Sequence, residues 1–172
     1  MHSVDQRWRP SVTVAAVAEQ QGRYLLVEEH TPEGLKLNNP AGHLEPGESP
    51  QQAVVREALE ESARVFTPQG LVGVYLSRSV RPASQQDSTY LRLAYCGLVG
   101  EEVPGLKLDH GIVRTLWLTL DEIRATVSRH RSPLLLRCVE DHAAGKRYPL
   151  ELVITDPSVL SAGPQGLDAG RR

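Results

Sequence analysis

A 23-residue segment from Gly42 to Arg64 constrains the fold more than any other part of the chain, and it reads GHLEPGESPQQAVVREALEESAR. It begins with glycines and a proline, which favour a turn, and it continues into residues that favour a helix. Ser49 is well placed as an N-cap, Pro50 suits the first helical position, and Gln52 completes a capping box. The segment therefore predicts a turn followed by a helix that extends to about Ser62.

This predicted helix has two distinct faces. Glu57, Glu60 and Glu61 lie on one side, because residues three and four apart are neighbours on a helix. A separate side is apolar and is expected to face a core; it consists of Val54, Val55, Ala58 and Leu59. Ala53 lies near the acidic side one turn earlier, and its small side chain is expected to leave room there.

Three neighbouring carboxylates repel one another, so the acidic face needs a compensating positive charge. Arg56, four residues before Glu60, supplies one positive charge, which does not balance three glutamates. Carboxylate oxygens at this spacing suit Mg²⁺, with Mn²⁺ as the alternative. A solvated acidic face is the competing interpretation, but the additional Glu48 and the adjacent Arg56 favour a metal site.

The same residues resemble the Nudix box. That motif has a Gly, five residues, a Glu, seven residues, and then Arg-Glu-apolar-x-Glu-Glu-x-Gly-apolar. The matching positions are Gly42, Glu48, Arg56, Glu57, Ala58, Glu60 and Glu61. Ala63 replaces the second glycine and Arg64 replaces the apolar residue. Because alanine adopts the left-handed cap conformation at a cost, the helix is expected to run further here, with no effect on the ligands.

The resemblance implies an α/β fold, a Nudix-type α/β/α sandwich with a mixed β-sheet, and hydrolysis of phosphoanhydride bonds. The metal ligands that it implies are Glu57, Glu60, Glu61 and the backbone carbonyl of Ala41, with Glu48 supporting the loop or an extra metal ion. Bound magnesium would neutralise the anionic oxygens and polarise the P–O bond. Arg56 would orient Glu57. The general base is either Glu57 or a carboxylate outside the motif such as Asp109, which also suits a turn.

Further segments resemble one bacterial branch of the family, the NudJ-like phosphatases. They are NNPAGHLEPGE at residues 38–48, Asp109-x-x-Ile112-x-x-x-x-Trp117, Arg131-Ser132-Pro133-Leu134 and Arg147-Tyr148-Pro149-Leu150. This resemblance covers roughly residues 10–155. It implies action on nucleoside di- and triphosphates and on hydroxymethylpyrimidine pyrophosphate. Short predicted loops and only 5% aromatic residues also favour small substrates.

Two other functions compete with this one. One is a Nudix enzyme of other specificity, which acts on oxidised nucleotides, ADP-ribose or dinucleoside polyphosphates; neither Tyr75 nor Pro82 decides between these. The other is a catalytically silent Nudix module that binds nucleotides. Such modules lose carboxylates of the motif, and this chain keeps all four, which favours an enzyme.

Candidate substrate-binding residues lie before and beside the motif. Lys36 and Asn39 are candidates for contact with a base or phosphate, although both also suit a surface position. His43 follows the motif glycine and either approaches phosphate or packs on the backbone. Arg78 and Arg92 lie in predicted strands and would meet anions if they face the cleft.

Hydrophobic patterning completes the fold prediction. It predicts strands at 12–18, 23–29, 35–38, 71–80, 89–99 and 112–118, the fifth broken near Gly97. Capping residues predict one helix after Thr119 and another from Ser132 to about Ala144. Residues 148–154 are expected to add a strand or a packed extension.

Composition limits the classes of partner and location. A chain of 172 residues with 40% apolar residues suits one domain, placed at 1–155, with a disordered tail at 156–172 that is rich in Gly and Pro. A net charge of −2 and the lack of a long apolar run argue against a nucleic acid polymer or a membrane as partner. Cys96 and Cys138 are expected to be reduced and packed in a core, as in a cytoplasmic protein. The partner is expected to be a small phosphoanhydride substrate, and the chain a monomer or homodimer.

Overall fold

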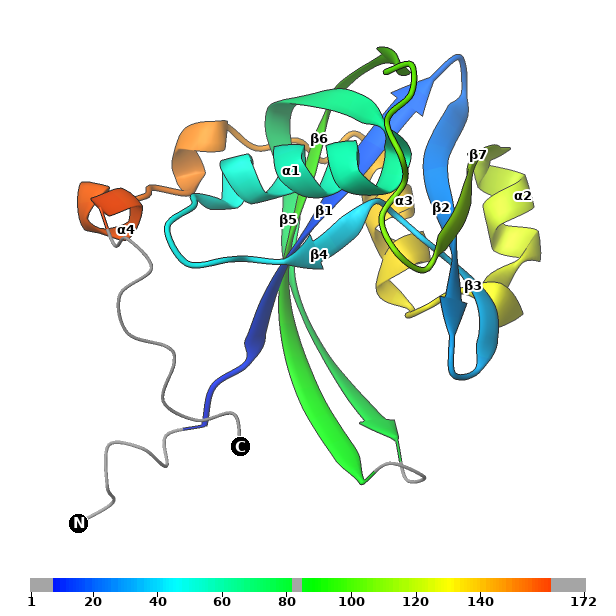
Figure 1. Cartoon of the computed structure of the whole chain (residues 1–172), viewed down its shortest axis with the longest axis horizontal. Helices are drawn as coiled ribbons and strands as arrows, with labels where there is room; N and C mark the ends of the chain where they lie inside the picture. Colours follow the sequence, from blue (N-terminus) through cyan, green and yellow to red (C-terminus); the bar gives the residue numbers. More distant parts are fainter. Residues whose placement is uncertain (1–7, 82–84, 162–172) are drawn as a thin grey trace.

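In the computed structural model, residues 8–81 and 85–161 are described (Figure 1). The strands are β1 (Ser11–Gln20), β2 (Arg23–Thr31), β3 (Gly34–Asn38), β4 (Ala41–His43), β5 (Arg64–Arg81), β6 (Gln86–Glu102) and β7 (Ile112–Thr119). The helices are α1 (Pro50–Ser62), α2 (Leu120–Ala125), α3 (Leu134–Ala143) and α4 (Pro157–Ser161), with short 3₁₀ turns at Val127–Arg129 and Leu150–Leu152. Within the described part, no helix is long and apolar enough to cross a membrane.

The sheet is mixed and runs in the order β3-β2-β1-β6-β5. β1 and β6 are parallel along Ser11–Ala18, whereas β5 pairs antiparallel with β6 and forms a long hairpin with it. β4 pairs with β1, and β7 pairs with β2, both antiparallel. β1 and β2 pair only next to their connecting turn and then separate, as Figure 1 shows.

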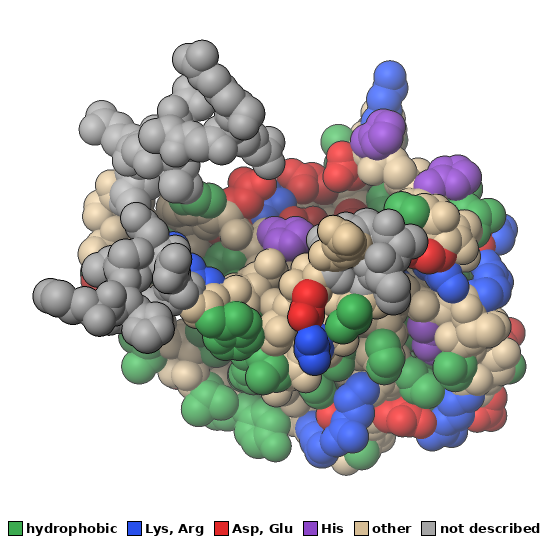
Figure 2. Space-filling model, turned by 90° about the horizontal axis from the view of Figure 1, so that it is seen from below, with side chains coloured by type: hydrophobic (Ala, Val, Ile, Leu, Met, Phe, Trp, Pro, Cys, Tyr) green, Lys and Arg blue, Asp and Glu red, His purple; other side chains and the backbone are tan. Residues whose placement is uncertain are grey.

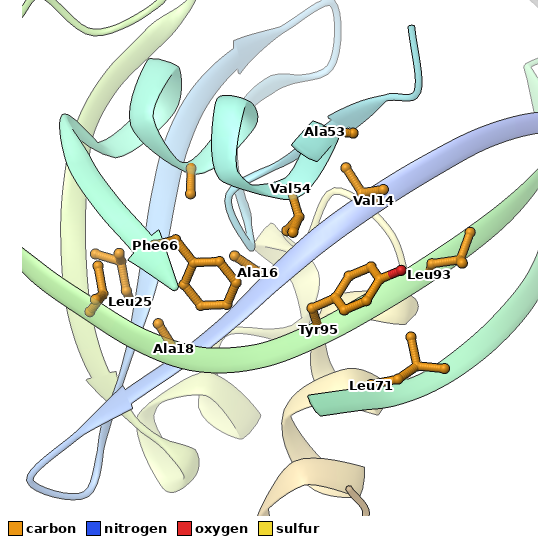
Figure 3. Close-up of a cluster of buried hydrophobic side chains, with 12 residues drawn as sticks. Val14, Ala16, Ala18, Leu25, Ala53, Val54, Phe66, Leu71, Leu93 and Tyr95 are labelled. Atoms are coloured by element: carbon orange, nitrogen blue, oxygen red, sulfur yellow. The ribbon is translucent and has the colours of Figure 1, made fainter. Parts of the chain in front are cut away.

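β1 is buried on both faces, which explains its continuous apolar sequence. Val14 and Ala16 pack in a cluster with Val54 of α1, Phe66 and Tyr95 (Figure 3). Alternate residues of β1 face the other way, because successive side chains of a strand point to opposite faces. These residues belong to a second cluster, formed by Ala15, Val17, Leu26, Ala94, Ile123, Leu135 and Val139 among others. The predicted α/β/α sandwich with a mixed sheet is therefore confirmed, with α1 on one face and α2 and α3 on the other.

The end of α1 differs from the prediction. Ala63 adopts the left-handed conformation with φ 54°, and its N–H donates to the Leu59 carbonyl, so the helix ends at Ser62 and runs no further. β5 then begins at once, at Arg64 instead of residue 71. Gly97 does not break β6, because this glycine allows the backbone of Thr67 on β5 to approach closely. Ala53 is fully buried in the core.

The C-terminal segments also differ in part from expectation. Tyr148 exchanges backbone hydrogen bonds of 2.8 and 2.9 Å with Leu71, so the packed extension is present as an isolated bridge. Pro157–Ser161 form the exposed helix α4 where a disordered tail was predicted, and residues 162–172 lie outside the described part. Cys96 and Cys138 are free and buried, as expected. The cytoplasmic location stays a prediction.

Candidate active site

The two ends of α1 are fixed by local hydrogen bonds, which sets the position of its carboxylates. Ser49 Oγ accepts a 3.1 Å hydrogen bond from the Gln52 backbone N–H, and Gln52 Oε1 accepts one of 2.8 Å from the Ser49 N–H. This is the predicted capping box. Together with the left-handed cap at Ala63, it fixes both ends of a 13-residue helix.

Arg56 joins the helix to the turn before it. Its guanidinium contacts both carboxylate oxygens of Glu48, at 2.7 and 3.0 Å, and also the His43 carbonyl at 2.9 Å. The same group contacts Glu57 at 2.8 Å and Glu60 at 3.1 Å. Burial raises the pKa of Glu48, but the hydrogen bonds from Arg56 and from the Glu45 N–H, together with the charge of Arg56, outweigh this effect and the pKa is lowered. The structure thus brings together Arg56 and Glu57, the pair that was expected to act together.

A cavity of about 520 Å³ lies beside this network, and Figure 2 shows acidic side chains gathered in a hollow on the same face. Its acidic side consists of Glu29, Glu45, Glu57, Glu61 and Asp109, and Ala41, Gly42 and His43 lie next to them. The rest of the lining comes from Thr13, Asn38, Ser77, Arg78, Ser79, Tyr90, Arg92 and residues 131–134. The volume of this cavity is within the range of about 300–1,000 Å³ that is typical of small-molecule sites.

Glu57 and Glu61 face this cavity and are poorly solvated. The carboxyl group of Glu57 packs against Gly42, where a side chain would overlap it. Burial raises the pKa of Glu57 against the effect of Arg56. Glu61 Oε2 accepts a 2.9 Å hydrogen bond from the Ala41 N–H. Burial raises the pKa of Glu61 to about 8, with further contributions from the charges of Glu57, Glu29 and Asp109.

A divalent cation fits these donors, because the buried Glu57 and the half-buried Glu61, with further negative charges beside them, lack a sufficient counter-charge. Glu60 differs from the other two: its side chain is 46% exposed, pairs with Arg56 and does not line this cavity. Within the described residues, no three His, Cys, Asp or Glu side chains are already arranged to hold a metal ion. Glu57 and Glu61 are therefore the carboxylates of the motif that the fold directs into the cavity.

The other predicted site residues have different fates. His43 lines the cavity, with its ring centroid 6.4 Å from that of Tyr90. Lys36 does not line it, since its Nζ donates to the Ser128 carbonyl at 3.0 Å on the surface. Asn39 is fully buried and also lies outside the lining. Asp109 does line the cavity, and its N–H donates to the Glu60 carbonyl at 2.8 Å. Both candidates for the general base therefore face the same space.

Sequence reasoning missed Thr13, Asn38 and Tyr90, which also line the cavity. Thr13 carries a detectable signal, because it is a hydroxyl residue within the otherwise apolar run VTVAAVA. Arg78 and Arg92 both face the cavity, which sequence reasoning had left open.

Comparisons with known proteins point to one family. Residues 7–138 match the model of the NUDIX domain. The phosphatase NudJ of Escherichia coli K12 is 32% identical over 146 residues, which are 85% of this chain and 92% of that protein. A NUDIX hydrolase structure from Nitrosomonas europaea is 51% identical with a TM-score of 0.78, covering 86% of this chain and 98% of that one. The NUDIX domain of Shewanella oneidensis NrtR, solved with ADP ribose, is 17% identical with a TM-score of 0.63 over 84% of this chain and 93% of that one, a likeness in fold alone.

Proposed function

This chain belongs to the Nudix hydrolase family, and from that premise we propose that it hydrolyses nucleoside di- and triphosphates and hydroxymethylpyrimidine pyrophosphate with Mg²⁺. One observation carries the proposal: the carboxyl groups of Glu57, which is buried, and Glu61, which is half-buried, face a single cavity beside α1. Bound Mg²⁺ supplies neutralisation of phosphate charge and a more acidic bound water.

The chain's own residues have separate tasks in this reaction. Glu57 and Glu61 would hold the cation together with the Ala41 backbone carbonyl. Arg56 keeps Glu57 in place through its 2.8 Å contact. Water attack on phosphorus requires a proton acceptor, and Glu57 and Asp109 both line the cavity. Glu60 lies at the rim of the cavity and is paired with Arg56. If its carboxylate left Arg56 and contacted the cation, it would be a third carboxylate ligand.

The size of the cavity favours small substrates. About 520 Å³ accommodates one nucleotide-sized ligand, and sites for drug-sized molecules have similar volumes. The described part of the lining offers one pair of aromatic rings, His43 and Tyr90, on which a base could stack. Recognition of the base is therefore expected to be broad, with the phosphates supplying most of the binding.

A substrate panel at saturating Mg²⁺ tests this specificity. The expected order of kcat/KM places nucleoside di- and triphosphates and hydroxymethylpyrimidine pyrophosphate above ADP-ribose and dinucleoside polyphosphates. A tenfold advantage of either larger substrate over every mononucleotide, about 1.4 kcal/mol, contradicts the proposed specificity and leaves the family membership intact.

A further inference from the structure

Three buried polar side chains on the wall of the cavity have hydrogen-bonding atoms that find no partner within the described part of the chain. These atoms are Nε and Nη1 of Arg92, Oγ1 of Thr13 and Oδ1 of Asn38. Each of the three residues is more than nine-tenths buried, with exposed fractions of 7, 7 and 8%. All three residues line the cavity, so these unpartnered atoms lie in its wall, next to the space that a ligand would occupy.

Arg92 and Thr13 are neighbours by strand register. β1 and β6 run parallel, and Thr13 pairs directly with Arg92. On the other side of Thr13, the antiparallel pairing of β1 with β4 places His43 beside it. A hydroxyl group and a guanidinium group therefore lie side by side on rigid central strands, next to the turn that precedes α1.

The two unpartnered nitrogens of the Arg92 guanidinium are costly for the fold, because buried N–H groups of a charged side chain lose their hydration without a replacement. Burial lowers the pKa of Arg92, and the thiol of Cys138 and the charges of Glu61 and Glu29 oppose this effect. Neither carboxylate is available as a counter-charge for Arg92 alone. Glu29 forms an ion pair with Arg131 at 3.1 Å, and Glu61 accepts a hydrogen bond from the Ala41 N–H. By contrast, Arg78, which also lines the cavity, makes a two-point ion pair with Asp87.

Resting on the proposed function, we propose that Arg92 and Thr13 form a phosphate-binding subsite, which takes non-reacting phosphate oxygens of the phosphoanhydride substrate. Nε–H and Nη1–H of Arg92 donate to phosphate oxygens, and the Thr13 hydroxyl donates a further hydrogen bond. Asn38 Oδ1 is an acceptor and does not belong to this subsite, because phosphate oxygens need donors.

A carbonyl oxygen of a nucleobase is also an acceptor, so Arg92 and Thr13 could instead bind the base of the substrate. A phosphate is favoured, because it supplies the negative charge that a buried guanidinium lacks, and charge-assisted hydrogen bonds are the stronger kind. The cation proposed at Glu57 and Glu61 takes up carboxylate charge, which leaves Arg92 in still greater need of an anion.

Binding of a non-hydrolysable probe tests the subsite independently of turnover. Methylenediphosphonate in the presence of Mg²⁺, and unphosphorylated cytidine in parallel, are titrated calorimetrically into the wild type, Arg92→Met, Thr13→Val and Arg124→Met. Arg124→Met removes the same charge outside the cavity, where Arg124 is exposed and pairs with Asp121 and Glu140. The melting temperature of each protein is measured alongside.

We expect Arg92→Met to weaken methylenediphosphonate binding by roughly tenfold or more, Thr13→Val by less, and Arg124→Met by under twofold. The melting temperature of Arg92→Met is expected to stay equal or rise, because a buried charge with two unpartnered nitrogens is removed. Unchanged binding by Arg92→Met overturns the proposal, as does a loss of binding together with a large drop in melting temperature, which indicates a structural role. A loss confined to cytidine overturns the phosphate assignment. If the wild type hydrolyses the substrates and Arg92→Met still binds methylenediphosphonate normally, the proposed function is supported and the subsite is refuted. If the binding results are as expected but the wild type hydrolyses none of the substrates, the subsite is supported and the proposed function is refuted.

Discussion

The carboxyl group of Glu57 lies directly against the Cα of Gly42, so close that a Cβ at position 42 would overlap its carbon and both oxygens. Gly42 does not have a positive φ, so any amino acid could adopt its backbone conformation. The glycine is required for space: it lets β4 and α1 approach until the carboxyl group meets the turn. The Nudix-box glycine and glutamate, 15 positions apart, are thus two sides of one contact.

Gly42→Ala is expected to lower kcat/KM by roughly 100-fold, because the added methyl group displaces the Glu57 carboxyl group and small misplacements of catalytic groups have effects of this size. The cost in stability is about 1–3 kcal/mol, typical of overpacking. Gly100→Ala is the control, since the nearest atom to a Cβ there is the Val65 carbonyl oxygen at 3.8 Å. Steady-state kinetics decide the matter, and wild-type activity in Gly42→Ala would refute the contact's role.

Arg56→Met is expected to lower both activity and stability. Removal of the guanidinium leaves Glu48, Glu57 and Glu60 without their shared counter-charge, at a cost of about 1–3 kcal/mol for this partly buried network. Arg56→Lys should recover only a fraction, because an ammonium group cannot span three carboxylates and the His43 carbonyl. Denaturant unfolding of both variants is compared with Arg124→Met, whose exposed pairs should contribute little because solvent screens them. Equal stability of all three variants would contradict this account.

Stability is expected to decline as the pH falls below about 6.5, in part because of His130. This ring is buried, and Nε2 lies 3.0 Å from the Ile123 carbonyl. Burial lowers the pKa of His130 below its ordinary 6.5, and the hydrogen bond opposes this only partly. The unfolded chain therefore binds a proton before the folded one does, so the stability present above the unfolded pKa is lost as the pH falls through the folded pKa.

The variant His130→Gln isolates this contribution. Its unfolding free energy, measured against pH at constant ionic strength, should approach that of the wild type as the pH is lowered from 7.5 to 5.5. His142, whose pKa burial also lowers, remains in both proteins and cancels in the difference. A difference that stays constant across this range would mean that His130 does not titrate differently in the two states.

Truncation after Thr155 is expected to leave activity unchanged and to alter the unfolding free energy by no more than about 0.5 kcal/mol. The described residues after this point form only the short α4, whose side chains are all exposed. The sequence beyond it is rich in glycine and has few large apolar residues to bury. Thermal melts and phosphate release measure both quantities. A substantial loss in either would show that the tail packs, within the chain or against a second copy.

Local signals predicted the local structure well. The capping boxes at Ser49 and Thr119 both form, because each depends on residues only three positions apart. The apolar run at residues 12–18 correctly predicted a strand, and the structure shows that β1 is buried on both faces. The bounds of β5 were not predictable in this way, since its first residues follow a left-handed alanine and their pairing with β6 depends on distant partners such as Val99 and Glu102.

For the candidate site too, features that depend on local spacing were predictable, and features that depend on long-range packing were not. Helical spacing placed Glu57, Glu60 and Glu61 together, but burial against β4 and β1 separates Glu57 and Glu61, which face the cavity, from Glu60, which meets Arg56 at the rim. Lys36 and Asn39 were predicted to bind substrate because they lie close to the motif in sequence. The path of the folded backbone, however, decides which side chains face the cavity, and these two do not line it. Thr13 and Arg92 come from strands 79 residues apart and meet only through the parallel register of β1 and β6.

Phosphate release from a nucleoside triphosphate, with and without excess chelator, tests the metal-dependent reaction most directly. With Mg²⁺ the wild type is expected to turn over, with chelator to stop, and with added Mg²⁺ or Mn²⁺ to recover. Glu61→Gln and Glu60→Gln should each lose most of the activity, because each removes one proposed cation ligand. The expected loss is several kcal/mol of transition-state stabilisation. Glu61→Gln should nevertheless melt no lower than the wild type at pH 8, since a neutral amide replaces a carboxyl group whose pKa is about 8. Full turnover in excess chelator would contradict the account.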